Sequence, residues 1–124
     1  MKVSVKVLNK QAMIPTKNKV NSYDIYACMD TPFRTIDPGK TETITTGLQV
    51  IIPEGYAGYL MSRNGVATRR GLRMSSGSML VESDLELVVS IYNDSNEKRT
   101  IENGHKIAKL ILVKIADVEF EVEE

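Results

Sequence analysis

The sequence predicts an all-β protein made of one domain, and three observations support this. Apolar residues alternate with polar ones in several short segments, which is the period of a strand with one buried face. Turn-forming residues separate these segments at intervals of about 8–12 residues, a spacing typical of sandwiches and barrels. The chain has 124 residues, the length of a single domain, and no repeat, linker or low-complexity segment divides residues 1–124.

The expected strands follow one another along the chain. Residues 2–7 alternate Lys or Ser with Val, so one face of this segment is apolar. Residues 41–52 are rich in Thr, Val and Ile, which suit a half-buried pleated surface. Residues 85–92 and 107–115 are strongly apolar and β-branched, and we expect them to form central strands. In residues 118–122, valine and phenylalanine alternate with glutamate, which predicts a last, half-exposed strand.

Residues suited to tight turns divide these strands. They lie at residues 37–39, 53–55, 64–65, 93–96 and 103–104. Helical character is expected only for residues 66–70, which is little more than one turn.

The composition excludes several classes of function. Sixteen basic and sixteen acidic residues leave no net charge, whereas a protein that binds a nucleic-acid backbone normally has a basic excess. Cys28 is the only cysteine, which excludes an internal disulfide and a cysteine-based zinc site. No apolar run approaches the roughly 20 residues of a membrane span, and the alternating N-terminus does not resemble a signal peptide. We therefore expect a cytoplasmic protein with no nucleic-acid or membrane partner.

Residues 62–71 are the first candidate for ligand binding. The segment follows an apolar strand and combines Arg63, Arg69 and Arg70 with a glycine-containing turn. Backbone N–H groups in such a turn can point in one direction and receive a phosphate, and arginines add charged donors. The alternative is an ordinary link between a strand and a turn, with solvated arginines.

Residues 75–84 are the second candidate. Glu82 and Asp84 lie two residues apart beside a run of Gly and Ser, so a strand would place both carboxylates on one face. Such a pair suits a general base or a metal ligand, although a solvated hairpin tip is the alternative. His105, the only histidine, is expected to be structural, and Cys28 to be a half-buried thiol that is not a nucleophile.

Four segments taken together resemble the motifs of the dUTPase family, trimeric enzymes that hydrolyse dUTP to dUMP and pyrophosphate. They are residues 21–27 (Asn-Ser-Tyr-Asp-Ile-Tyr-Ala), 62–67 (Ser-Arg-Asn-Gly-Val-Ala), 78–87 and 104–110 (Gly-His-Lys-Ile-Ala-Lys-Leu). Their order and spacing resemble the family from residue 1 to about residue 117. The resemblance implies a β-clip or jelly-roll-like barrel and a homotrimer with shared active sites. It also implies Mg²⁺ bound through the triphosphate rather than by the protein directly.

The resemblance also implies roles for individual residues. They are Glu82 as the catalytic base; Arg63, Asn64, Gly65 and Arg69 at the phosphates; Ser76, Gly77, Met79 and Leu85 at the nucleoside; and Asp24 and Lys109 at structural positions of the motifs.

The third motif departs from the family pattern. Counted forward from Arg63, Glu82 falls on the family's water-activating aspartate and Leu85 on its tyrosine. Counted back from Asn93, the hairpin is two residues short and Leu80 falls on the catalytic position instead. A glutamate has one more methylene group than an aspartate, and a misplacement of about 1 Å can cost on the order of 100-fold in rate.

Further departures concern the other motifs and the end of the sequence. Asn64 replaces a phosphate-contacting serine, and Lys109 replaces a glutamine. The last residues are acidic, where the family has a glycine-rich motif that covers the nucleotide.

We therefore expect a homotrimer that binds dUTP, dUMP or a related deoxynucleotide and whose hydrolysis of dUTP is weak or lost. The alternative is an inactive dUTPase-fold protein that acts as a regulator or as a scaffold for a protein partner, located in the host cytoplasm or nucleus if it is viral. The related dCTP deaminases resemble the chain less, because they have Arg-Ser-Ser where residues 63–65 read Arg-Asn-Gly.

Overall fold

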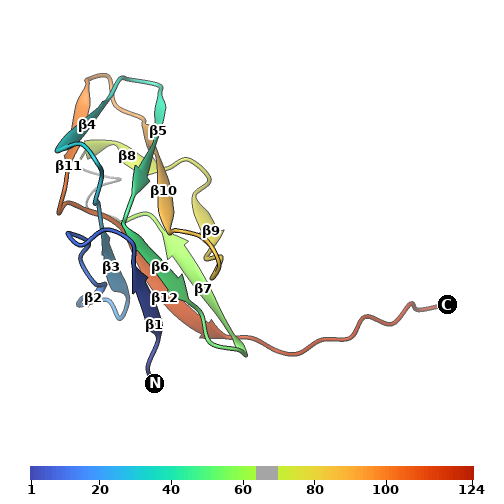
Figure 1. Cartoon of the computed structure of the whole chain (residues 1–124). Coiled ribbons are helices and arrows are strands. Elements are labelled where there is room, and N and C mark those ends of the chain that lie inside the picture. Colours follow the sequence, from blue (N-terminus) through green and yellow to red (C-terminus); the bar gives the residue numbers. More distant parts are fainter. Residues whose placement is uncertain (64–69) are drawn as a thin grey trace.

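The computed structural model describes residues 1–63 and 70–124, and it confirms the predicted all-β fold (Figure 1). The described residues form twelve strands, which are β1 (Ser4–Val7), β2 (Thr16–Lys17), β3 (Tyr23–Tyr26), β4 (Phe33–Ile36), β5 (Thr41–Thr45), β6 (Leu48–Ile51), β7 (Tyr56–Met61), β8 (Leu72–Met74), β9 (Ser78–Leu80), β10 (Val88–Asn93), β11 (Arg99–Glu102) and β12 (Lys106–Lys114).

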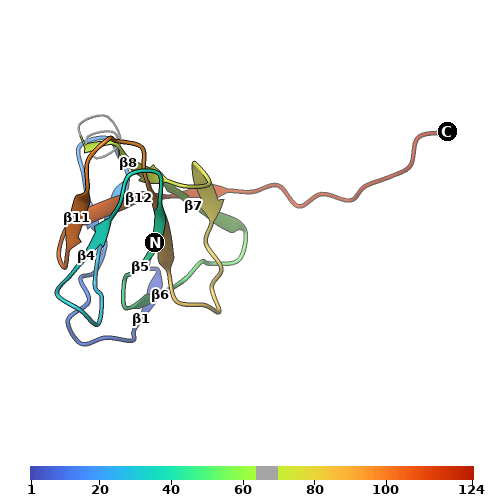
Figure 2. The same ribbon diagram turned by 90° about the horizontal axis from the view of Figure 1, so that it is seen from above.

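The largest sheet is antiparallel and has five strands in the order β2-β3-β12-β7-β9. A three-stranded sheet, β5-β10-β8, and two strand pairs, β1-β6 and β11-β4, complete the barrel-like body (Figures 1 and 2). Alternate residues of β10 and β12, such as Val89, Ile91 and Leu110, point into the core between the sheets. The apolar segments expected to be central strands therefore do supply the core.

Two predicted strands are shorter than expected. Residues 41–52 divide into β5 and β6 at Gly47, which has a φ of 69°. A Cβ at Gly47 would lie 2.8 Å from the Cβ of Asn9, so the close approach of the N-terminal segment also requires glycine there. Strand β10 begins at Val88 rather than at residue 85, because the backbone N–H of Leu85 closes a turn on the carbonyl of Glu82.

The prediction of a last strand at residues 118–122 is wrong for the isolated chain. Beyond β12 the chain leaves the body in an extended form, and the Phe120 side chain is 94% exposed (Figures 1 and 2). The physical reason is that β12, the strand just before this segment, is already paired with β3 on one edge and β7 on the other. Residues 118–122 therefore cannot fold back and pair with β12 as a hairpin.

Positive φ angles at Gly39, Gly55 and Gly104 confirm three of the predicted turns. The turn expected at residues 64–65 lies outside the described residues, as does most of the helical segment expected at 66–70. Within the described part of the chain, no helix has the length and hydrophobicity needed to cross a membrane.

Candidate functional site

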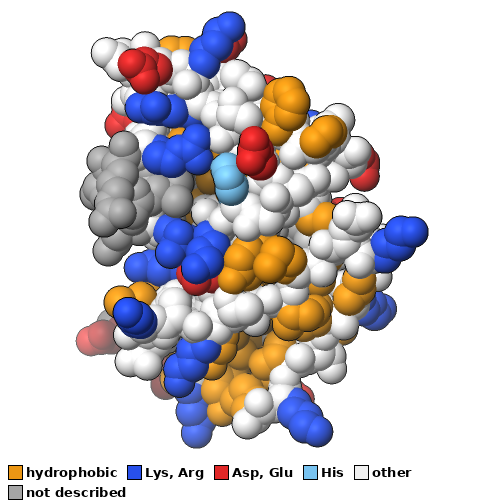
Figure 3. Space-filling view, turned by 90° about the vertical axis from the view of Figure 1, so that its left-hand side faces the viewer, with side chains coloured by type: hydrophobic (Ala, Val, Ile, Leu, Met, Phe, Trp, Pro, Cys, Tyr) orange, Lys and Arg blue, Asp and Glu red, His pale blue; other side chains and the backbone are white. Residues whose placement is uncertain are grey.

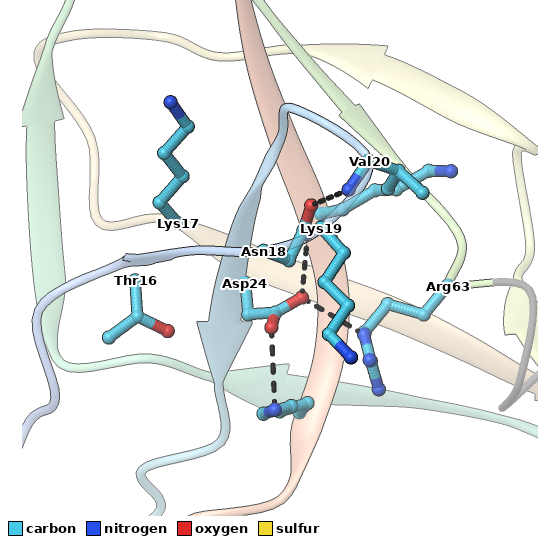
Figure 4. Close-up of a pocket in the computed structure, with 9 residues that line it drawn as sticks. Thr16, Lys17, Asn18, Lys19, Val20, Asp24 and Arg63 are labelled. Atoms are coloured by element: carbon cyan, nitrogen blue, oxygen red, sulfur yellow. Dashed lines mark hydrogen bonds and ion pairs between the residues drawn. The ribbon is translucent and has the colours of Figure 1, made fainter.

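An open pocket of about 500 Å³ lies beside β2, β3 and β12, next to the end of β7 (Figure 4). Five cationic side chains line it, but only one carboxylate does. The lining residues are Thr16, Lys17, Asn18, Lys19, Val20, Asp24, Arg63, Lys106 and Lys109. Figure 3 views the molecule from the left-hand side of Figure 1, and many of the Lys and Arg side chains on this face lie along one of its sides. Because the whole chain has no net charge, this gathering is a local feature that favours a polyanionic ligand.

Asp24 lies at the centre of the pocket and is 2% exposed. Its Oδ1 accepts a hydrogen bond from Arg63 Nε at 3.1 Å, and its Oδ2 lies 3.5 Å from Lys106 Nζ. A buried carboxylate is tolerated in a protein only when it is paired in this way. Asp24 therefore holds the two cationic side chains in place, which is a structural role of the kind expected from its motif.

Asn18 fixes the loop between β2 and β3 onto the same carboxylate. Its Nδ2 donates to Asp24 Oδ1 at 3.1 Å and to Ser22 Oγ at 2.7 Å. Its Oδ1 accepts from the backbone N–H groups of Val20 and Ser22 at 3.0 and 3.1 Å. Asn21 in this loop has a φ of 61°, a left-handed conformation that asparagine tolerates better than most residues.

The register of the five-stranded sheet brings Lys109 next to Asp24 in the pocket. Lys109 on β12 is paired with Asp24 on β3 and with Met61 on β7, so Lys109 and Asp24 share one face of the sheet. The structure thus brings together Asp24, Arg63 and Lys109, which three separate motifs supply. Asn64, Gly65 and Arg69, expected at the phosphates, lie outside the described residues.

The residues expected at the nucleoside lie just before, along or after β9, at the other edge of the sheet. Ser76 and Gly77 form the turn between β8 and β9, and Gly77 has a φ of 78°. The Met79 side chain packs against the core, whereas Leu85 is 54% exposed. Of this group, Leu85 presents the most apolar surface to the outside.

Glu82 is exposed and stands in the turn that follows β9. Its neighbour Ser83 anchors this turn: Ser83 Oγ accepts from Ile52 N–H at 2.9 Å, and the Ser83 carbonyl accepts from Gln49 Nε2 at 2.8 Å. The turn is therefore fixed beside β6, not beside the pocket.

The sheet register separates Glu82 from the cationic pocket of its own chain. One row of paired residues runs across the sheet from Asp24 through Lys109 and Met61 to Ser78, which spans three intervals of about 4.8 Å between strands. Glu82 lies four residues beyond Ser78. A general base has to lie within about 3 Å of the proton it removes, or one water molecule away. Glu82 therefore does not lie beside the Asp24–Arg63 pair of its own chain.

Cys28 and His105 are the two remaining residues for which the sequence predicts a role. Cys28 is buried rather than half-buried, and burial, followed by the nearby carboxylates of Glu86 and Asp30, raises the pKa of its thiol. A raised pKa leaves little thiolate at neutral pH, so Cys28 is a poor nucleophile. His105 Nδ1 accepts a hydrogen bond from Glu102 N–H at 3.1 Å, which is a structural contact.

Sequence reasoning missed the contribution of the β2–β3 loop, although a signal was present. The run Lys-Asn-Lys at residues 17–19 precedes the first motif by only a few residues. Asparagine caps backbone turns through its side chain, and here a lysine lies on each side of it in the sequence. Among the described residues, no group of three His, Cys, Asp or Glu side chains is arranged to hold a metal ion.

Comparisons with known proteins identify the family to which the chain belongs. The family model for dUTPase matches residues 9–124. A deoxyuridine 5'-triphosphate nucleotidohydrolase of Acinetobacter baylyi is 33% identical over 134 aligned positions, which cover 100% of this chain and 89% of that protein. The enzyme of the same name from Idiomarina loihiensis is 36% identical over 104 positions, covering 82% of this chain and 68% of that protein.

Solved structures give the same result. A mutant dUTPase of Staphylococcus bacteriophage 80alpha with dUpNHpp is similar with a TM-score of 0.85 and 27% identity, over 99% of this chain and 88% of that one. A mutant dUTPase from phage phi11 of S. aureus, described with a structural Mg(II) ion, is similar with a TM-score of 0.86 and 25% identity, over 100% of this chain and 97% of that one. The expected dUTPase-like barrel is confirmed, and the chain belongs to the dUTPase family.

Proposed function

We propose that the protein binds deoxyuridine nucleotides with their phosphates in the pocket around Asp24 and Arg63, and that it hydrolyses dUTP to dUMP and pyrophosphate slowly. The observation that carries this proposal is the set of five cations around a single buried carboxylate. Arg63 uses Nε on Asp24, so its two terminal nitrogens can donate to phosphate oxygens. Family membership supplies the substrate class, because the Acinetobacter and Idiomarina relatives are named for dUTP hydrolysis.

In the proposed function, Mg²⁺ binds to the triphosphate and not directly to the protein. The carboxylate that the pocket offers, Asp24, is occupied on Oδ1 by Arg63 and on Oδ2 by Lys106. A hard cation such as Mg²⁺ prefers carboxylate, water and phosphate oxygens, so the residues present fit a metal that arrives bound to the triphosphate. When bound, Mg²⁺ neutralises charge on the phosphate chain, while Arg63 and Lys109 orient it.

A homotrimer is the second part of the proposal, and the separation of Glu82 from the pocket supports it. If Glu82 is the base, a second copy of the chain has to bring it to the phosphates. The outer face of the five-stranded sheet is suited to such contact. Tyr59 is paired with Ile111 and Leu80 on this face, and Tyr59 and Leu80 are 40% and 54% exposed. A closed ring of three copies would bury this apolar surface.

The extended C-terminal segment supports the same assembly. Val118, Phe120 and Val122 alternate with acidic residues, and their side chains are 60%, 94% and 88% exposed. Strand β1 pairs with β6 alone among the described strands, and in residues 2–7, which include it, valine alternates with Lys2, Ser4 and Lys6. The acidic segment of one copy therefore complements the basic edge strand of another in charge and in apolar period.

The nucleotide-binding proposal predicts a large effect for Arg63. Arg63→Ala is expected to weaken binding of a non-hydrolysable dUTP analogue by at least about 10-fold, because charge-assisted hydrogen bonds contribute roughly 1.5–3 kcal/mol. Arg73→Ala is the matched control, since Arg73 lies over the Tyr92 ring, 4.9 Å from its centroid, and does not line the pocket. Titration calorimetry measures both, and equal losses for the two variants would contradict the proposed site.

The assembly proposal predicts a mass of three times the 13.8 kDa of one chain in light scattering. Replacing Val118, Phe120 and Val122 together by serine is expected to shift this mass toward the monomer at micromolar concentration. Replacing Glu119 and Glu121 by glutamine keeps the apolar side chains and is expected to disturb assembly much less. A wild-type monomer across the micromolar range would overturn the trimer.

An inactive scaffold is the competing function. The glutamate at position 82 and the leucine at position 85 favour it, because both differ from the residues that the family's third motif has at these places. A pyrophosphate-release assay against all deoxynucleoside triphosphates with Mg²⁺ separates the two functions. Identification of a protein partner and the cytoplasmic location remain predictions from the sequence.

A further inference from the structure

The loop between β2 and β3 presents two lysines to the pocket, one on each side of Asn18. Lys17 ends β2 and Lys19 follows Asn18, and both are exposed and line the pocket. Figure 4 shows that their side chains point in opposite directions. The Lys19 side chain extends across the front of the Asp24–Arg63 pair, whereas the Lys17 side chain points away from that pair.

The backbone that carries Lys19 is fixed before any ligand arrives. Asn18 binds Asp24 and Ser22 through its Nδ2, and it accepts from the backbone of Val20 and Ser22 through its Oδ1. The backbone N–H of Asn18 also donates to the Ser22 carbonyl at 2.9 Å. Because the loop is already ordered, a ligand that Lys19 contacts has to immobilise only the side chain, which lowers the cost of binding.

The charge around Lys19 is not balanced by the pocket itself. Asp24, the carboxylate of the pocket, already faces Arg63 and Lys106. Lys19 does not occur in the ion pairs formed by the described residues. Lys19 therefore adds a positive charge to a cluster of like charges, and such an arrangement is relieved when an anion binds between them.

We propose that Lys19 binds the outer phosphates of a nucleotide and so sets the preference of this protein for a triphosphate over a monophosphate. The inference rests on the proposed function, since it concerns the same pocket. A single phosphate can be held by Arg63 and Lys106, the two cationic side chains paired with Asp24. A longer phosphate chain carries more charge and more oxygen atoms, and the β2–β3 loop borders the same pocket, so Lys19 is placed to contact the additional phosphates.

The experiment compares three variants by titration calorimetry with dUMP, with α,β-imido-dUTP and with inorganic tripolyphosphate. Lys19→Ala is expected to weaken binding of the imido analogue and of tripolyphosphate about tenfold, and that of dUMP by no more than about twofold. Lys19→Arg is expected to restore the tight binding. Lys40→Ala removes the same charge from an exposed lysine that does not line the pocket, and it is expected to weaken each ligand by about twofold or less. Unchanged melting temperatures show that all three variants are folded.

The outcomes separate the inference from the function on which it rests. Equal losses for Lys40→Ala and Lys19→Ala, or equal losses for dUMP and the triphosphate analogue, would mean that Lys19 contributes only general charge, and the inference would be wrong. If the wild type binds neither deoxyuridine compound, the proposed function fails. The tripolyphosphate titration still decides on Lys19 in that case, because an unchanged affinity in Lys19→Ala overturns its role as a phosphate ligand.

Discussion

Glu82→Gln is expected to lower the rate of dUTP hydrolysis by about 10²–10⁴-fold, the usual contribution of a general base. The amide keeps the size of the side chain but cannot accept a proton from water at neutral pH. The wild-type rate is itself expected to be far below the ordinary enzyme range of about 1–10 per second, since Glu82 reaches further than an aspartate would from the same backbone position. Glu82→Asp is therefore expected to raise the rate.

Pyrophosphate release with dUTP and Mg²⁺ measures these rates, and calorimetry with the imido analogue shows whether binding is unchanged. Asp84→Asn is the matched control, because Asp84 is an exposed carboxylate of the same turn. A wild-type rate of about 1–10 per second that Glu82→Gln abolishes would show that Glu82 is already well placed. A rate unaffected by Glu82→Gln would remove Glu82 from the mechanism.

Asp24→Ala is expected to destabilise the fold by about 2–4 kcal/mol. Removing one partner of a buried ion pair costs roughly 3–5 kcal/mol, and the value is discounted here because Arg63 and Lys106 are 30% and 46% exposed and regain solvent. The variant also removes the acceptor of the Asn18 amide, so the β2–β3 loop loses its anchor. Asp24→Asn keeps the size of the side chain and one acceptor oxygen, and a smaller loss is expected.

Urea denaturation followed by circular dichroism measures these free energies of unfolding at a fixed protein concentration. Asp37→Ala is the control, because Asp37 is an exposed carboxylate whose partner Lys98 lies at 3.9 Å, and about 0.5 kcal/mol or less is expected. Equal changes for Asp24→Ala and Asp37→Ala would show that the buried carboxylate does not organise the site.

The sequence predicts a strand correctly where the alternation of apolar and polar residues is enough to define it. The cores of β10 and β12 were found because their buried residues are apolar and β-branched. The start of β10 was placed three residues too early, since Leu85 is apolar but closes a turn. The segment at 118–122 has the period of a strand, but a strand also needs a neighbour, and period carries no information about that.

The candidate site was predictable only in part. The motifs identify residues, but they do not say how far apart these residues lie in the folded chain. Asp24, Arg63 and Lys109 were found in three different motifs, and the strand register brings them together. The contribution of Asn18 depends on a hydrogen bond to a carboxylate six residues away, and the Lys-Asn-Lys run indicates only local backbone capping, not this contact. The separation of Glu82 from the pocket follows from the order of strands in one sheet, which the local sequence does not encode.

That separation has a consequence for how activity responds to dilution. Each chain carries the cationic pocket at one edge of its five-stranded sheet, and Glu82 follows the strand at the other edge. If the proposed function holds, a complete catalytic unit exists only while copies of the chain are associated. Hydrolysis per chain then falls as protein concentration drops below the dissociation constant of the assembly, while every chain remains folded.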